Sequence, residues 1–340
     1  MIVRAGAQLT RRRFLVAGLA GALAACTPPR RPEHGPVAAM FPGRIDDGGF
    51  MESGYRGLRR AAHDLGFPIR WVDRVAPNRE ALLEALRGLA ASEATLVVAH
   101  GGQSSAAAQR VAWEFPEQRF VVIQGDDLRP NLAVYEVAQE ESAWLAGALA
   151  GLTTRTNIVG HLSGLRVRPG LIARAAFAHG LITANPQARL LTHFTGDQDD
   201  VDAARRVALA EIDAGADVLF TMLNSARTGA IEACRARRIP QIGNALDWVA
   251  AMPDVFIASA VADAGYGIFQ AARDLHDSVW RGDIRKRFGL RFPEAVRLAL
   301  GTAIPAETRR RLDSWRGELA ARKLIISDRF DGPEFVPGAR

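Results

Sequence analysis

Short apolar runs alternate with amphipathic helical stretches along most of this sequence, and this alternation constrains the fold more than any other feature. The runs Val37–Phe41 and Leu96–Ala99 hold only apolar residues, and Met51–Leu65 has apolar residues at helical spacing. Apolar runs of about four to five residues separated by helices are typical of βαβ units, in which both faces of a parallel sheet are buried. The sequence therefore predicts an α/β fold.

The alternation is interrupted once and then restarts, which indicates two units. After Asn131 come a predicted strand at residues 134–137 and a long predicted helix at about 140–153, and strands return at Ile158–His161. A length of 340 residues suits about two domains. We therefore expect two doubly wound lobes of similar size. Ligands of such sheets bind at the carboxyl ends of the strands, so both lobes would line an interlobe cleft.

Residues 1–25 have the pattern of an export signal. Arg11–Arg13 precede the apolar run Phe14–Ala25, which is too short to span a membrane. The arginines followed by Phe-Leu resemble a twin-arginine signal, and Leu23–Cys26 resembles a bacterial lipobox. We expect residues 1–25 to be a signal peptide, Cys26 to be lipidated, and residues 26–36 to form a Pro-rich tether at a membrane surface. An uncleaved anchor, or an ordinary signal with an incidental Cys26, is the alternative.

The charge of the chain does not indicate a nucleic-acid partner. Four of the 43 basic residues lie in residues 1–25, so the net charge of +6 falls to +2 without them. Basic residues cluster at 284–287 and 309–311, and we interpret both clusters as solvated faces of helices or loops. No later stretch is apolar over the length that a membrane-spanning helix needs.

Motifs of catalysis and metal binding are missing from the sequence. None of the seven histidines forms a His-x-x-x-His or His-Glu pair, and Cys234 has no metal-ligand partner near it in the sequence. There is no Gly-x-Ser-x-Gly elbow and no phosphate-binding Gly-x-x-x-x-Gly-Lys loop. We therefore expect no enzymatic activity, no metal and no cofactor. A transcription regulator would carry a helix-turn-helix where this chain has its export signal.

Several blocks of the sequence together resemble one family. Gly43–Phe50, Glu140–Ala150, Gly215–Val218 and Ile242–Asp247 resemble, in order and spacing, blocks of the basic membrane protein (BMP, PnrA-like) family, which are solute-binding lipoproteins of ABC importers. The resemblance implies two Rossmann-like lobes in the type I periplasmic-binding-protein architecture, joined by crossover strands and closing on a ligand. Lobe 1 would comprise residues 37–131 with about 260–298, and lobe 2 residues 132–259 with about 299–340.

The expected ligand residues of lobe 1 follow its first and third strands. Phe50 matches a family phenylalanine that stacks on a nucleobase, although it could instead pack on its own helix. Asp46 and Asp47 could accept hydrogen bonds from the ligand or cap that helix. His100, Gly101 and Gly102 follow a buried strand, where they could approach a ligand or simply form a tight turn.

The expected ligand residues of lobe 2 lie at matching strand ends. Phe220 and Asn224 end one strand, and an asparagine can pair with both edges of a purine. Asn244, Asp247 and Trp248 follow the next strand. Trp248 could supply a second stacking face or cover a hinge.

Departures from the family bear on the ligand. Ala245 and Ala262 stand where the family has an aspartate and a lysine that are associated with the ribose, and Trp248 stands where it has a glutamine. Without those groups a buried ribose would leave hydroxyls unpaired, at about 1–3 kcal/mol each. We therefore hypothesise that the ligand is a free purine-like base or a related aromatic metabolite, rather than a standard nucleoside.

The resemblance implies binding without chemistry. We expect an exported, membrane-anchored lipoprotein that acts as a monomer, with a small purine-type ligand and an ABC permease as partners. A lipoprotein that reports ligand occupancy to a membrane receptor is one alternative, and a nucleoside-processing enzyme is another.

Overall fold

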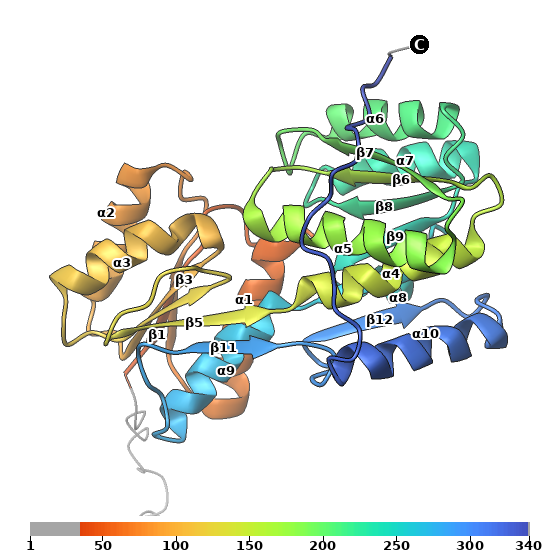
Figure 1. Cartoon of the computed structure of the whole chain (residues 1–340). Coiled ribbons are helices and arrows are strands. Elements are labelled where there is room, and N and C mark those ends of the chain that lie inside the picture. The colour runs from red at the N-terminus through yellow and green to blue at the C-terminus, as the bar shows by residue number, and fades with distance from the viewer. Residues whose placement is uncertain (1–34, 339–340) are drawn as a thin grey trace, which may run out of the picture. The chain divides into compact units, whose positions relative to one another are not determined.

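The computed structural model describes residues 35–338 and contains two six-stranded sheets (Figure 1). The expected signal peptide and Cys26 lie outside the described residues. The first sheet contains β1 (Val37–Met40), β2 (Ile69–Val72), β3 (Leu96–His100), β4 (Phe120–Ile123), β5 (Leu132–Val137) and β11 (Arg285–Phe288). The second contains β6 (Ile158–Ser163), β7 (Arg189–Phe194), β8 (Val218–Met222), β9 (Gln241–Ala245), β10 (Phe256–Ala262) and β12 (Val296–Leu300).

Both sheets are doubly wound, as the alternation predicts. The first has the order β11-β5-β4-β3-β1-β2 with every pair parallel. The second has the order β12-β10-β9-β8-β6-β7, and only β12 runs antiparallel to its neighbour. The prediction of two Rossmann-like parallel-sheet lobes is therefore confirmed. We call the first sheet with its helices lobe 1, and the second sheet with its helices lobe 2.

Helices cover both faces of each sheet (Figure 1). In lobe 1, α1 (Phe50–Leu65) packs with α9 (Ala264–His276), and α2 (Arg79–Ala90) packs with α3 (Ser105–Glu114), which the turn η1 (Gly102–Ser104) precedes. In lobe 2, α4 (Gln139–Thr153) packs with α5 (Arg168–Ala184), and α6 (Val201–Asp213) packs with α7 (Arg227–Arg237). The short α8 (Trp248–Ala251) follows β9, and α10 (Ala306–Ala320) packs on α4.

The buried residues of a central strand explain this layering. Successive side chains of a strand point to opposite faces. Val37 and Ala39 of β1 belong to the core that includes α1 and α9, while Ala38 and Met40 belong to the core under α2 and α3. Because both faces need apolar residues, the strand is an uninterrupted apolar run, which is why the sequence reveals it.

Three strands differ from the sequence-based expectation. Leu132–Val137, expected in lobe 2, forms β5 of the first sheet and pairs with β4, so the chain leaves that sheet after Val137 rather than at residue 131. The basic cluster at 284–287, interpreted as a solvated helix or loop face, contains the parallel edge strand β11. Its charged side chains are neutralised by carboxylates, since Arg285 pairs with Glu136 and Lys286 with Asp274. β12 pairs antiparallel with β10, which periodicity alone does not distinguish.

The chain passes between the two sheets three times. It does so from β5 into α4, from β10 into α9, and from β11 to β12. One apolar core contains Leu58 and Tyr135 of lobe 1 together with Trp144 and Phe220 of lobe 2, so the lobes share buried surface. The crossings bring the carboxyl ends of strands from both sheets to the same region.

Candidate functional site

The loop after β1 is shaped by the start of α1. The side chain of Asp47 is 3% exposed and accepts hydrogen bonds from the backbone N–H groups of Gly49, Met51 and Glu52, at 2.8, 3.1 and 3.0 Å. Burial raises the pKa of Asp47, and these N–H groups oppose the shift. Asp46 is exposed instead and pairs with Arg44 at 3.0 Å. Asp47 is therefore the helix-capping residue of the two.

The capping role can be tested by comparing the two aspartates. Replacing Asp47 with alanine is expected to cost about 1–2 kcal/mol of unfolding free energy, because the N–H group of Gly49 and two N–H groups of the first turn of α1 lose their acceptor. The matched change Asp46→Ala is expected to cost less than about 0.5 kcal/mol, because its ion pair is exposed. Urea unfolding of both variants measures the difference. Equal costs would contradict the assignment.

His100 packs against Phe50 and lines neither of the two cavities described below. The two rings stack with centroids 4.2 Å apart, and His100 Nε2 lies 2.9 Å from the carbonyl oxygen of Phe50. Because His100 is completely buried, its pKa is lowered to about 4. The neutral ring therefore donates through Nε2 to this carbonyl. Gly101 and Gly102 continue into η1, and Gly101 has a φ of +94°, which glycine adopts without strain.

Gly49 lets lobe 1 approach lobe 2 closely. The backbone N–H of Phe50 donates to Oδ1 of Asn224, at 3.3 Å. A Cβ atom added at Gly49 would overlap that asparagine side chain, and one added at Gly48 would lie 3.4 Å from the ring of Trp248. The loop after β1 therefore meets the strand ends of β8 and β9 directly.

Sequence reasoning missed a buried arginine behind this contact. Arg227, at the start of α7, is 2% exposed, and its guanidinium lies over the ring of Trp248 at 4.6 Å. It donates to the backbone oxygen of Leu223 and, at 2.8 Å, to Oδ1 of Asn244. Burial lowers the pKa of Arg227 to about 9, so it stays protonated at neutral pH. The only sequence signal was an arginine three residues after Asn224, which resembles any solvated helix residue.

A small cavity lies beside these residues in lobe 2. Its volume of about 10 Å³ has room for about one water molecule. It is lined by Gln139, Ala143, Ala173, Phe220, Met222, Asn244, Ala245, Ala260 and Ala262. Phe220 is completely buried and stacks on Phe177 with centroids 4.6 Å apart. Ala245 and Ala262, the two departures at positions that the family associates with the ribose, both line this wall.

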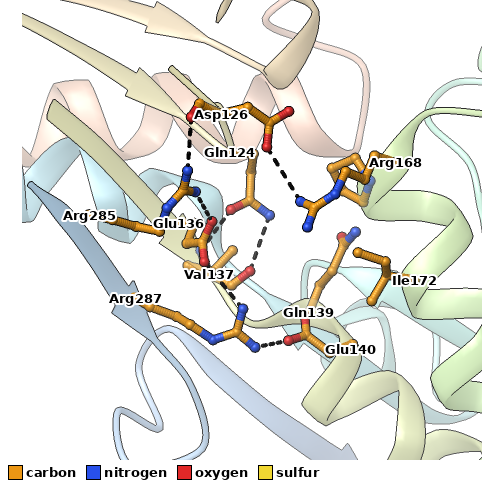
Figure 2. A pocket seen from close by; sticks show the side chains of 11 residues that line it. Gln124, Asp126, Glu136, Val137, Gln139, Glu140, Arg168, Ile172, Arg285 and Arg287 are labelled. Carbon is orange, nitrogen blue, oxygen red and sulfur yellow. Dashed lines mark hydrogen bonds and ion pairs between the residues drawn. The ribbon is translucent and has the colours of Figure 1, made fainter. Parts of the chain in front are cut away.

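A larger polar pocket (Figure 2) shares the lining residue Gln139 with the small cavity. Its volume is about 300 Å³, at the lower end of the range for small-molecule sites. Lobe 1 contributes the ends of β4, β5 and β11, while Arg168, Pro169 and Ile172 come from α5 of lobe 2.

The charged groups of the polar pocket are already paired. Arg285 contacts Glu136 at 2.7 Å, Arg287 contacts Glu136 and Glu140, and Arg168 contacts Asp126 at 3.4 Å (Figure 2). Three guanidinium groups thus balance three carboxylates. The sequence analysis predicted none of these residues, because they come from distant segments and belong to no motif.

The structure brings some of the expected site residues together and separates others. Phe50 contacts Asn224 where the lobes touch, Gly48 approaches Trp248 there, and Arg227 joins Trp248 to Asn244. Asp46 is exposed, while the side chains of Asp47 and His100 hydrogen-bond to the backbone at the start of α1. Asp247 caps α8 and pairs with Arg297 at 3.2 Å. None of these four lines either cavity, and neither do Phe50, Asn224 and Trp248; among the expected site residues, Phe220 and Asn244 line the small cavity.

Metal and membrane features were searched within residues 35–338. In that range no group of three or more His, Cys, Asp or Glu side chains could hold a metal ion. No helix of the same residues has the length and apolarity to cross a bilayer. Cys234 is buried and free, and burial raises the pKa of its thiol to about 12.

Comparison with known proteins identifies the family. The profile of the family described as ABC transporter substrate-binding protein PnrA-like matches residues 36–293. The chain belongs to this Bmp family. It is an ABC-type substrate-binding protein, as the resemblance in the sequence implied.

Relatives of the Bmp family and solved structures agree with this assignment. The chain is 24% identical to basic membrane protein A2 of Borrelia garinii subsp. bavariensis, over 85% of this chain and 87% of that protein. A solute-binding protein of an ABC transporter system from Conexibacter woesei is 25% identical with a TM-score of 0.70, covering 86% of this chain and 99% of that one. A second, from Aeropyrum pernix, is 18% identical and shows the same fold with a TM-score of 0.76, covering 87% and 94%.

Proposed function

We propose that this Bmp-family protein is the extracytoplasmic solute receptor of an ABC importer and binds a purine-type base between its lobes. The observation that carries the proposal is the contact between the Gly48–Phe50 loop of lobe 1 and Asn224 and Trp248 of lobe 2, where Arg227 joins Trp248 to Asn244. Aromatic rings can stack on a flat heterocycle, and amides can pair with its edges. These groups bind a ligand, and none of them needs to transform it.

A base requires the lobes to move apart before it can enter. The cavity beside Phe220 has room for about one water, and the Gly49–Asn224 contact closes the region from the side of lobe 1. The polar pocket gives solvent a route to Gln139 between the lobes. A ligand that bridges the lobes would then favour the closed form by its higher affinity for that form, and the closed form would dock on the permease.

The wall of the small cavity favours a base without a sugar. Ala245, Ala260 and Ala262 present only methyl groups and backbone there. A ribose against this wall would leave its hydroxyls without partners, at about 1–3 kcal/mol each. The free base is therefore the ligand that this surface accommodates at lowest cost.

Calorimetry with purine bases and their nucleosides tests the proposal. Hypoxanthine is expected to bind about tenfold or more tightly than inosine, because two or more unpaired ribose hydroxyls, at about 1–3 kcal/mol each, would together lower the affinity by more than about tenfold. Tighter binding of the nucleoside would contradict the free-base ligand. Binding of neither, or turnover of the nucleoside, would contradict the proposed function itself.

Membrane attachment is proposed on the sequence alone. Cys26 would carry the lipid, and residues 26–36 would tether a monomeric receptor near its permease. Mass spectrometry of the membrane-extracted protein is expected to find a lipidated N-terminal Cys26. An intact N-terminus at Met1 would contradict the lipoprotein assignment.

A further inference from the structure

The hydrogen-bonding direction of the two site asparagines is fixed by their partners. An asparagine amide has one accepting oxygen and one donating nitrogen. Oδ1 of Asn224 accepts a hydrogen bond from the backbone N–H of Phe50, and Oδ1 of Asn244 accepts one from Nη2 of Arg227. A backbone N–H and a guanidinium can only donate, so neither amide can be turned around without losing its bond. The nitrogen of each amide is what remains for a ligand.

Arg227 is itself held in place, and it therefore keeps the amide of Asn244 in one orientation. It is held by the backbone oxygen of Leu223 and by the face of Trp248, and within the described residues it has no carboxylate at ion-pair distance. A buried cation without a carboxylate attracts electronegative atoms. Nε of Arg227 and Nε1 of Trp248 are also buried donors without a hydrogen-bond partner in the described structure. This part of lobe 2 therefore has an excess of N–H donors.

We propose that Arg227 is a positioning residue that turns the amide nitrogen of Asn244 toward the small cavity, so that the site selects a base carrying a carbonyl oxygen over one carrying an amino group. Asn244 lines that cavity and its oxygen is occupied, so the group it can offer is an N–H donor. An oxopurine places an accepting oxygen where an aminopurine places a donating nitrogen. The inference rests on the proposed function, because it names which class of purine this same site takes.

Hypoxanthine and adenine are the probes, since hypoxanthine carries an accepting O6 and a donating N1–H where adenine carries a donating amino group and an accepting N1. Calorimetry of the purified protein is expected to show hypoxanthine binding about tenfold or more tightly than adenine, because an amino group against a donor leaves two buried donors unpaired. Binding of neither base overturns the purine ligand and this inference with it. Adenine binding as tightly as hypoxanthine overturns this inference alone.

Variants separate positioning from a merely structural role. Asn244→Asp keeps the shape and the Arg227 contact but presents an accepting oxygen, so the preference is expected to reverse in favour of adenine. Arg227→Gln is expected to reduce the preference to about twofold or less, because the amide of Asn244 is no longer held in one direction. The control Arg235→Gln, on the same helix in an exposed pair with Asp254, is expected to leave the preference unchanged. If Asn244→Asp keeps the preference for hypoxanthine, the proposal is wrong. If Arg227→Gln fails to fold, the Asn244→Asp measurement alone decides the proposal.

Discussion

Replacing Gly147 with alanine is expected to destabilise the protein by about 3 kcal/mol or more, although only one methyl group is added. Gly147 lies in α4 where this helix packs against α5. A Cβ atom there would overlap the backbone oxygen of Phe177, and the reciprocal change at Gly180 would overlap the backbone oxygen of Trp144. Because the obstacle is backbone rather than the end of a flexible side chain, two helices would have to separate.

Gly88→Ala is the matched control for this prediction. Gly88 lies on the exposed face of α2, and an added Cβ meets nothing within 4 Å. The same substitution is therefore expected to stabilise the protein by about 0.5–1 kcal/mol, through the lower entropy of the unfolded chain. Urea unfolding of both variants measures the two effects. A Gly147→Ala variant within about 1 kcal/mol of the native protein would mean that α4 and α5 are less closely packed than described.

Most of the scaffold could be predicted from the sequence, because strands that are buried on both faces must consist of apolar residues. A strand such as β3, buried on both faces, must be apolar throughout, and Leu96–Ala99 therefore stands out. β11 could not be found in this way. Its Arg-Lys-Arg-Phe sequence is stabilised by Glu136 and Asp274 from other elements, and such pairing leaves no periodic signal.

The site was less predictable, because the same type of side chain can either bind a ligand or stabilise the local fold. Asp46 and Asp47 are adjacent and chemically identical, and only the position of α1 makes one of them a cap. Phe220 was expected as a ligand residue at a strand end, and it lines the small cavity with its ring stacked on Phe177, a helix residue distant in the sequence.

A buried carboxyl group in lobe 2 leads to the second large prediction. Glu211 of α6 is completely buried beside Gly160, and neither carboxyl oxygen has a hydrogen-bond partner within the described residues. The backbone of His161 lies close enough to lower the pKa of Glu211 to some extent, although it forms no hydrogen bond with the carboxyl group. Burial therefore raises the pKa of Glu211 well above its ordinary value of 4.5. In the folded protein the group stays protonated over a pH range in which the unfolded chain ionises it.

The pH dependence that follows has a definite sign. Below about pH 4.5 both states carry the proton, so the group contributes no pH dependence to the stability. As the pH rises above this value, the unfolded chain alone gains from ionisation, so stability falls by about 1.4 kcal/mol per pH unit until the folded-state pKa is reached. Glu211→Gln has nearly the same shape and cannot ionise. The unfolding free energy of this variant is therefore expected to rise relative to the native protein, by about that slope, as the pH increases from the unfolded pKa of 4.5 toward the raised folded-state pKa.

Urea unfolding at several pH values measures this difference, and other titrating groups largely cancel because both proteins contain them. Glu232→Gln on the exposed surface of α7 is the control, and it is expected to stay within about 0.5 kcal/mol of the native protein throughout. A constant offset between Glu211→Gln and the native protein would mean that Glu211 ionises alike in both states. That result would require an unseen partner for its carboxylate, because an isolated charge in this core costs far more than the fold can absorb.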